Sequence, residues 1–319
     1  MSGVRARLGL VGAGRWGRRY IETINAMDGV ELAWVASGNP DTQRRAPGAR
    51  VVPEWRKLLN AGLDGVVIAT PPAVHGEMLR AFVEVGIPSM VEKPLCLGLA
   101  EACELREIIR ATGVPVLVDH TQLFHPAFTV LKERAESLGR VKHIRSESMA
   151  FGPFRPDVSV LWDWAAHDIS LCLDLLGRLP ERVSALGDGN SVALSLDFDG
   201  GPAAWITNSN MSMEKRRAFT VHFDRRVLVL NDLSDCKLVE HELDSSSSAG
   251  GGLPGATSNP PVSNAMPLTQ AVEYFVEGLG HGDRGRFGLD LACDVIRVLD
   301  AADRSMSAAC PMTPCGQPQ

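Results

Sequence analysis

The 319-residue sequence lacks the features that mark several special classes of protein. It contains no run of about 18 consecutive apolar residues, so we expect no membrane-spanning helix. The apolar part of its opening stretch, MSGVRARLGLVGAG, is too short for a signal peptide. Positive charge is not in excess, because 32 Lys and Arg face 38 Asp and Glu and the net charge is −6. These absences predict a protein that binds neither membranes nor nucleic acid.

Cysteines at the spacing of a metal site are also missing. The seven cysteines include no CxxC pair, and the nearest two, Cys310 and Cys315, lie in a proline-rich tail. An odd number of scattered cysteines is typical of reduced thiols in a cytoplasmic protein. We therefore expect a cytoplasmic location and no metal.

The first third of the chain alternates short apolar runs with segments of helical spacing. The length leaves room for about two domains. The predicted strands are 6–11, 30–36, 64–70, 88–93 and 114–120, and the predicted helices are 15–27, 54–61, 72–86 and 98–112. Strands that alternate with helices predict an α/β domain over 1–121, with a parallel sheet covered on both faces.

The rhythm changes after residue 121. We predict helices over 126–138 and 162–176, and extended runs at 143–151, 182–187, 191–198, 203–213, 216–224 and 226–232. Short connections between such runs favour an antiparallel sheet, so residues 122–319 are predicted to form a second, α+β domain. The stretch 244–261, rich in Ser, Gly and Pro, is predicted to be a loop. A helix over about 286–304 carries a broad apolar stripe and is predicted to pack back on the first domain.

The motif VGAGRWG places three glycines, Gly12, Gly14 and Gly17, between the first strand and the first helix. In a dinucleotide-binding turn, the first glycine permits the tight turn and the second lets the backbone approach the pyrophosphate. The third allows helix and strand to pack closely, and the helix N-terminus faces the phosphates. We predict that NAD or NADP binds to Gly12, Ala13, Gly14, Arg15, Trp16 and Gly17. The alternative is a purely structural glycine turn.

The end of the second strand bears on the choice between NAD and NADP. An acidic residue there would bind the ribose 2′-hydroxyl of NAD, but Ser37 and Gly38 occupy this place. Arg44 and Arg45 follow a few residues later and could pair with a 2′-phosphate. We therefore predict NADP in preference to NAD, while Asp41 keeps NAD open as the alternative.

Two further motifs lie at strand ends, where open α/β sheets bind their ligands. ATPPAVH follows the third long strand, and EKP ends the next one. Lys93 is expected to point its ammonium into the same crevice, near a positively charged nicotinamide. The predicted cofactor site therefore also contains Thr70, Pro71, Pro72, His75, Glu92 and Lys93. Taken alone, His75 is more typical of an exposed position on a helix. Glu92 and Lys93, taken alone, are more typical of a salt bridge between neighbouring residues.

The stretch VLWDWAAHDIS sets Asp163, His167 and Asp168 among large apolar residues. If 162–176 is one α-helix, Asp163 and His167 are four residues apart and project from one face. Asp168 then points elsewhere and has a supporting role. The alternative is that Asp163 caps the helix and His167 is a histidine of the core.

Taken together and in this order, GAGRWG, ATPPAVH, EKP and WDWAAHD resemble the motifs of the Gfo/Idh/MocA family of oxidoreductases. The resemblance covers about residues 7–305. It implies an N-terminal Rossmann domain with a doubly wound parallel sheet, and a C-terminal domain with an open, mostly antiparallel sheet. It also implies NAD(P)-dependent hydride transfer to or from a secondary alcohol or ketone of a sugar, nucleotide sugar or cyclitol. In the family's catalytic positions stand Lys93, Asp163 and His167.

On this hypothesis His167 exchanges the hydroxyl proton, Lys93 hydrogen-bonds the reacting oxygen, and Asp163 orients the substrate or His167. Two other interpretations remain open. One is a cofactor-binding sensor or scaffold without turnover, and the other is an enzyme that uses tightly bound NAD in a closed redox cycle. An open sheet face would also expose apolar surface, which predicts a homodimer or homotetramer.

The sequence departs from the commonest family pattern in two places. No glycine-rich segment precedes Asp163, and no acid follows the second strand. Together with DHTQLFHPAF, the first departure resembles a branch associated with nucleotide-sugar and polysaccharide pathways. Four cationic side chains could bind a diphosphate: Arg155, Lys215, Arg216 and Arg217. The simpler expectation is that they are exposed to solvent on a strand.

Overall fold

The computed structural model describes residues 6–243, 254–279, 288–308 and 314, which divide into two compact units. Unit 1 contains residues 1–121 and 266–296, and unit 2 contains residues 122–265 and 297–319. Each unit has one sheet, six-stranded in unit 1 and eight-stranded in unit 2.

The sheet of unit 1 is parallel, with the strand order β3-β2-β1-β4-β5-β6. Its strands are β1 (Ala6–Val11), β2 (Val30–Ala36), β3 (Arg50–Val52), β4 (Gly65–Ile68), β5 (Ser89–Glu92) and β6 (Val116–Asp119). Leu8, Leu10 and all of Val66–Ile68 are fully buried, as expected for parallel strands that are covered on both faces. The predicted Rossmann-type sheet is thus confirmed.

The helices of unit 1 follow most of the predicted segments. They are α1 (Arg15–Asn25), α2 (Thr42–Arg45), α3 (His75–Glu84), α4 (Leu99–Thr112) and α7 (Pro267–Gly278). The α-helix predicted over 54–61 is wrong, because Trp55–Asn60 forms a 3₁₀-helix, η1. A second 3₁₀ turn, η2 (Pro72–Val74), precedes α3. Three elements were not predicted from the sequence: α2, β3 and α7.

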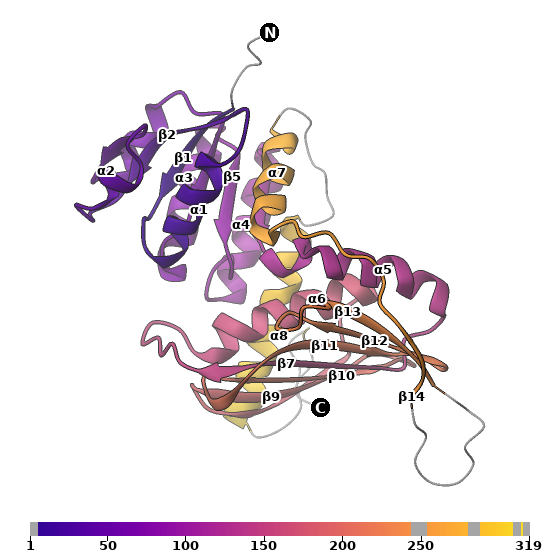
Figure 1. Cartoon of the computed structure of the whole chain (residues 1–319). Helices are drawn as coiled ribbons and strands as arrows, with labels where there is room; N and C mark the ends of the chain where they lie inside the picture. Colours follow the sequence, from indigo (N-terminus) through magenta and orange to yellow (C-terminus); the bar gives the residue numbers. More distant parts are fainter. Residues whose placement is uncertain (1–5, 244–253, 280–287, 309–313, 315–319) are drawn as a thin grey trace. The chain divides into compact units, whose positions relative to one another are not determined.

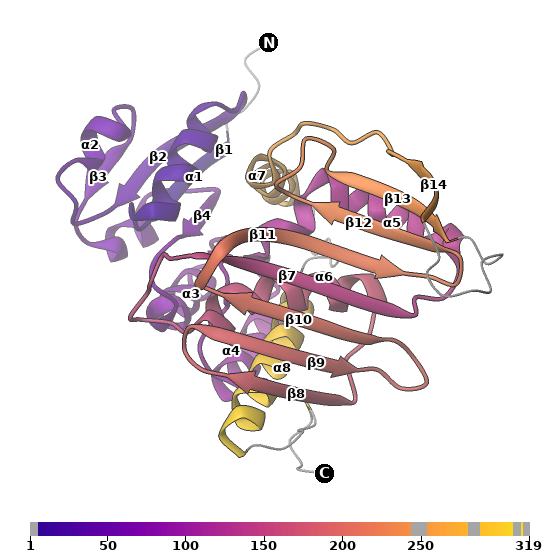
Figure 2. The same cartoon turned by 60° about the horizontal axis from the view of Figure 1, so that its bottom comes forward.

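The sheet of unit 2 is mixed, and only its β7–β10 pair is parallel among the described strands. The order is β14-β13-β12-β11-β7-β10-β9-β8, which confirms the mostly antiparallel prediction. The strands are β7 (His143–Phe151), β8 (Arg182–Gly187), β9 (Ser191–Asp197), β10 (Ala203–Ser209), β11 (Met211–His222), β12 (Arg226–Asn231), β13 (Leu238–Leu243) and β14 (Pro254–Ser258). Figure 2 shows β8 to β13 side by side as one curved layer.

Helices α5 (Pro126–Leu138) and α6 (Ala166–Leu176) lie on one face of this sheet (Figure 1). Burial alternates along β10 in agreement, since Ala204 and Ile206 are buried while Trp205 is 56% exposed. A 3₁₀ turn, η3 (Thr121–Phe124), and a turn of π-helix, η4 (Leu161–Ala165), precede the two helices. The opposite face of the sheet carries no helix in the described part of unit 2.

Several predicted boundaries in the second half are wrong. The runs 203–213 and 216–224 are divided at Asn210, so that β11 is one long strand from residue 211. Part of the predicted loop 244–261 forms β14, which pairs with β13, itself not predicted, while residues 244–253 lie outside the described part. The last helix is α8 (Leu289–Ala308), which begins in unit 1 and ends in unit 2.

Two further findings concern the described residues of both units. No helix among the described residues is both long enough and apolar enough to cross a membrane. The five cysteines within the described ranges, Cys96, Cys103, Cys172, Cys236 and Cys293, are free thiols, and Cys310 and Cys315 lie outside those ranges.

Candidate active site

The glycine turn after β1 is held by close backbone packing. Gly12 has φ of +93°, and a Cβ there would lie 2.6 Å from the carbonyl oxygen of Ala69. A Cβ on Gly17 would lie 2.0 Å from the carbonyl oxygen of Gly12, so only glycine fits both positions. A Cβ on Gly14 would meet no atom within 4 Å. Gly14, at the N-cap of α1, therefore leaves room for a ligand against the backbone.

Other residues of this loop have mixed environments. Ala13 is 5% exposed, and Arg15 is exposed at the first position of α1. The guanidinium of Arg19 lies 4.6 Å from the ring centroid of Trp16. Residues 15–18 contain no carboxylate, so the partial positive charge of the helix N-terminus is not neutralised by its own first turn.

The segment after β2 folds into the short helix α2 rather than an irregular loop. The Ser37 hydroxyl accepts hydrogen bonds from the Asn39 backbone N–H (3.1 Å) and from the Thr42 hydroxyl (2.9 Å). Arg44 Nη2 lies 3.5 Å from a carboxylate oxygen of Asp41, and both side chains are largely exposed. The two residues predicted to favour opposite cofactors therefore form one exposed ion pair.

His75 is not the exposed helix residue that the sequence alone indicated. It is fully buried, with Nε2 2.8 Å from the carbonyl oxygen of Thr70 and Nδ1 3.0 Å from that of Pro94. The imidazole therefore ties the ATPPAVH loop to the EKP loop. Pro71 is extended and Pro72 opens η2, as expected for proline at the first turn of a helix.

Lys93 lies in a buried polar cluster at the carboxyl ends of β5 and β6. Register pairs Glu92 with Asp119, and both are buried, as is Lys93 at 7% exposure. The Tyr20 hydroxyl, from α1, donates to Asp119 and also lies in hydrogen-bonding contact with Glu92. The carboxyl ends of two strands and the helix behind the glycine turn are thus joined around the lysine.

The electrostatics of this cluster are dominated by burial. Burial raises the pKa of Asp119 to about 6, although hydrogen bonds from Tyr20 and Thr121 and the charge of Lys93 act in the opposite direction. The pKa of His120 falls to about 3, first through burial and then through the charge of Lys93. Both ring nitrogens of His120 are buried without a hydrogen-bond partner among the described residues. His120 is therefore neutral near pH 7.

Three members of this cluster, Tyr20, Asp119 and His120, were missed as site residues in the sequence. Asp119 and His120 end the predicted strand 114–120, at the same sheet edge as Lys93, and that position was an available signal. Tyr20 carried no comparable signal, because its place in α1 reads as an ordinary core position.

In unit 2, Asp163 does not lie in a regular α-helix. The single helix predicted over 162–176 is wrong in its first turn, because Leu161–Ala165 is π-helical and α6 begins at Ala166. The wider π turn changes the angle between Asp163 and His167 that α-helical spacing predicts. Arg155 Nη1 lies 3.2 Å from Asp163 Oδ1 and holds this carboxylate in an ion pair.

Asp168 anchors α6 to the sheet. Its carboxylate accepts hydrogen bonds from the hydroxyls of Ser146 (2.6 Å) and Ser148 (3.3 Å) and from the amide of Asn208 (2.5 Å). It is 4% exposed, and burial raises its pKa although these three donors oppose the shift. This network fixes the segment that carries His167.

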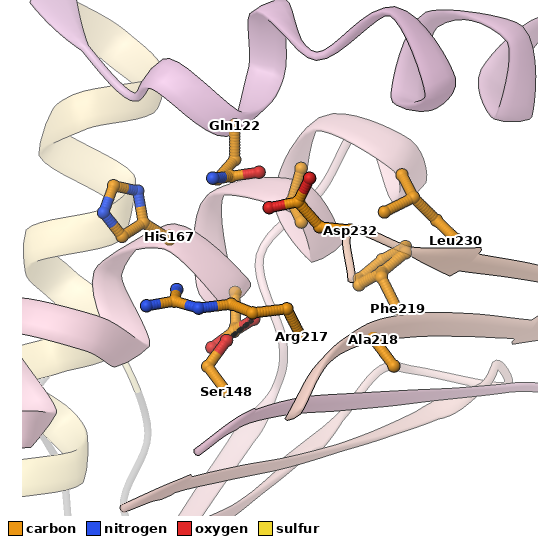
Figure 3. A pocket seen from close by; sticks show the side chains of 10 residues that line it. Gln122, Ser148, His167, Arg217, Ala218, Phe219, Leu230 and Asp232 are labelled. Carbon is orange, nitrogen blue, oxygen red and sulfur yellow. Dashed lines mark hydrogen bonds between the residues drawn. The ribbon is translucent and has the colours of Figure 1, made fainter. Parts of the chain in front are cut away.

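His167 lines a small pocket between α6 and the helix-covered face of the sheet (Figure 3). Figure 3 shows the guanidinium of Arg217 extending toward His167, with Gln122 and Asp232 across the pocket. The remaining lining residues are Ser148, Asp168, Leu171, Ala218, Phe219 and Leu230. The pocket thus combines apolar surface, a guanidinium, an amide and carboxylates next to a histidine, as in sites for small polar molecules.

Known proteins resemble this chain in both sequence and fold. Residues 6–120 match a family model described as an oxidoreductase family with an NAD-binding Rossmann fold. A crystal structure from Magnetospirillum magnetotacticum is 40% identical, with a TM-score of 0.84, over 93% of this chain and 99% of that one. UDP-N-acetylglucosamine 3-dehydrogenase of Acidithiobacillus ferrooxidans is 29% identical over 213 residues, 65% of this chain and 64% of that protein. Inositol 2-dehydrogenase of Rhizobium meliloti is 27% identical over 247 residues, 70% of this chain and 72% of that protein.

The match to the Acidithiobacillus ferrooxidans enzyme thus spans just under two thirds of that enzyme's length. The family match lies on β1 to β6, which include the glycine turn and the EKP motif. The resemblance stated from the sequence is therefore confirmed: this chain belongs to the Gfo/Idh/MocA family of oxidoreductases with an NAD-binding Rossmann fold.

Proposed function

We propose that this protein transfers a hydride between NAD(P) and a secondary alcohol or ketone of a sugar, nucleotide sugar or cyclitol. The observation that carries the proposal is the glycine turn, which opens at Gly14 at the sheet edge where β5 delivers Lys93. The relatives named as a UDP-N-acetylglucosamine 3-dehydrogenase and an inositol 2-dehydrogenase support the substrate class.

The residues present fit the dinucleotide. Gly12–Gly17 and the N-terminus of α1 would hold the pyrophosphate, with Ser37, Gly38 and Arg44 near the adenosine ribose. Thr70–Pro72 and Lys93 lie at the ends of the next strands toward the nicotinamide side. When bound, the nicotinamide supplies the hydride or receives it.

The chain's own residues would manage the proton and the developing charge. His167 exchanges the hydroxyl proton, because an imidazole ring can both accept and donate a proton. Lys93 donates a hydrogen bond to the reacting oxygen and stabilises negative charge on it. Asp163, held by Arg155, orients the substrate or His167.

Substitution separates catalysis from cofactor binding. Lys93→Met and His167→Ala should each lower turnover by about 100-fold or more, since positioned acid and base groups contribute factors of this size. NADH binding by His167→Ala should stay as in wild type, because His167 belongs to unit 2. If both variants turn over an accepted sugar or cyclitol within a few-fold of wild type, the assignment of these residues is wrong.

We infer a preference for NADP from the segment after β2. Ser37 has no carboxylate that would repel a 2′-phosphate. Arg44 can exchange its ion pair with Asp41 for an ion pair with that phosphate. Arg44→Gln should weaken NADPH binding by about 10-fold and leave NADH binding nearly unchanged. Tighter binding of NADH than of NADPH by the wild-type protein would contradict this preference.

We also propose that a homodimer or homotetramer forms through the open face of the unit 2 sheet. Trp205 is 56% exposed there, and its ring lies 4.3 Å from that of His143 on β7. Soluble proteins commonly cover exposed apolar patches by association. Light scattering at micromolar concentration should give a mass of two or four chains, and a monomer would contradict the proposal.

A further inference from the structure

Arg217 differs from the other arginines near the pocket of unit 2. Arg155 is paired with Asp157 and Asp163, and Arg216 with Glu147 and Glu214. Arg217 makes no ion pair with any residue in the described ranges, although it lines the pocket that contains His167. Its guanidinium lies 5.3 Å from the ring centroid of Trp164, and its charge acts to lower the pKa values of Asp168 and Asp232, the two carboxylates of the pocket.

The strand register explains why neighbouring arginines have different surroundings. On β11, Arg217 pairs with Ser148 of β7, whose hydroxyl donates to Asp168, so Arg217 points to the helix-covered face. Arg216 pairs with Met149 and points to the opposite face, because successive strand residues alternate. The two arginines therefore cannot clamp a diphosphate together, and Arg217 acts without Arg216.

The two carboxylates of the pocket are already engaged by other donors. Asp168 accepts its three hydrogen bonds from Ser146, Ser148 and Asn208. Asp232 is paired with His125 at 3.2 Å and lies 3.9 Å from Lys237. The side-chain amide of Gln122 lines the same pocket. The guanidinium of Arg217 and the amide of Gln122 are therefore the hydrogen-bond donors that these residues present to the pocket.

We infer that Arg217, with Gln122, recognises a carboxylate carried on the ring of the sugar substrate, an inference that rests on the proposed function. A guanidinium presents donors only, in a planar fork that matches the two oxygens of a carboxylate. A single cation whose charge is partly offset by two aspartates suits a monoanion better than a phosphate, which carries more charge. Because Arg217 and His167 line the same small pocket, the carboxylate belongs on the reacting ring, as in a uronic acid.

The test compares matched pairs of sugars that differ only in the acidic group. The pairs are glucuronate with glucose, galacturonate with galactose, and UDP-glucuronate with UDP-glucose, each assayed for NAD(P)-dependent turnover. In at least one pair the wild-type protein should prefer the uronate, by about 10-fold or more in kcat/KM. Arg217→Gln should lower kcat/KM for that uronate by about 10- to 100-fold. It should change kcat/KM for the matching neutral sugar by less than about 3-fold.

Arg216→Gln is the matched control, because Arg216 is the next residue on the same strand and faces away from the pocket. It should behave as wild type, and Arg217→Lys should be intermediate, because lysine keeps the charge but not the fork. Arg217→Gln should still bind NADH with wild-type affinity, which shows that it is folded. Preference for the neutral sugars, equal losses on both members of a pair, or preference for glucose 6-phosphate over glucuronate overturns the inference.

Calorimetric titration keeps this inference separate from the proposed function. If no alcohol is turned over, the proposed function fails, and uronate binding to the NADH-loaded protein decides the inference. Binding of glucuronate, galacturonate or UDP-glucuronate to wild type and Arg216→Gln but not to Arg217→Gln supports it. Absence of binding, or binding that Arg217→Gln does not weaken, overturns it.

Discussion

The hydroxyl of Tyr20 on α1 donates a hydrogen bond to the carboxylate of Asp119 at the end of β6, 99 residues away in sequence. Both side chains are fully buried, and Glu92 of the EKP motif lies against the same hydroxyl. This contact joins the helix behind the glycine turn to the strand end beside Lys93. It therefore links the element proposed to bind phosphate to the residue proposed to act on the substrate.

Tyr20→Phe should destabilise the protein by about 1–3 kcal/mol, because it leaves a buried carboxylate oxygen of Asp119 without its donor. Urea unfolding of Tyr20→Phe, Asp119→Asn and the double variant measures the effect. The double variant should lose less than the sum of the two single losses, since both remove the same contact. Additive losses would show that the two residues do not interact.

His120 should make stability depend on pH. Its folded pKa of about 3 lies below the unfolded value of 6.5, so its contribution is present above pH 6.5 and is lost as pH falls toward 3. Between pH 7 and pH 5 this amounts to about 2 kcal/mol of lost stability. Asp119 acts in the opposite direction, because its raised pKa of about 6 makes its contribution fall as pH rises from 3.8 to 6.

His120→Asn isolates the histidine from this balance. Asparagine does not titrate, so the variant should gain stability relative to wild type as pH falls from 7 to 5. Urea midpoints of the two proteins at several pH values measure the difference. Parallel pH profiles would mean that the imidazole is not kept neutral by burial.

The glycine turn allows a paired substitution. Gly17→Ala should cost at least about 2 kcal/mol of stability, because its Cβ would meet the carbonyl oxygen of Gly12 at 2.0 Å. Gly14→Ala should melt like wild type, since its φ of −70° suits alanine and no protein atom lies within 4 Å of the added carbon. Thermal melting of both variants checks this contrast, which equal melting temperatures would contradict.

The anchor of α6 can be weakened at Asp168. Asp168→Asn replaces one carboxylate oxygen with an NH₂ group. This group donates rather than accepts, and it would face the donors of Ser146, Ser148 and Asn208. We expect a loss of about 2–3 kcal/mol in urea unfolding, compared with about 1 kcal/mol for Ser146→Ala, which removes one donor. A smaller loss for Asp168→Asn than for Ser146→Ala would contradict the network.

Five of the six strands of unit 1 and its glycine turn were predictable, because buried parallel strands are apolar runs in the sequence and glycine marks the turn. Val66–Ile68 and Gly12 are examples. Long-range pairing decided what composition could not. Part of the Ser, Gly and Pro-rich stretch, Pro254–Ser258, forms β14 because β13 supplies its partner, with Glu240 opposite Ser258.

The site was predictable in its residue types and not in its geometry. Residue spacing alone cannot reveal the π turn that carries Asp163. A π turn has i→i+5 hydrogen bonds in place of the α-helical i→i+4 bonds, and no sequence pattern marks this change. His75 is buried because two loops distant in sequence close on it. The contrast between Arg216 and Arg217 follows from strand alternation, yet it depends on a register that only the paired strand defines.

The most direct test of the account is a fluorescence titration of the wild-type protein and Gly14→Ala with NADH and NADPH. We expect saturable binding to wild type, tighter for NADPH, and a loss of about 10-fold or more in Gly14→Ala, whose added methyl occupies the space left for the pyrophosphate. Binding of neither nucleotide to wild type, or equal binding by both proteins, would contradict the claim that this turn holds the cofactor.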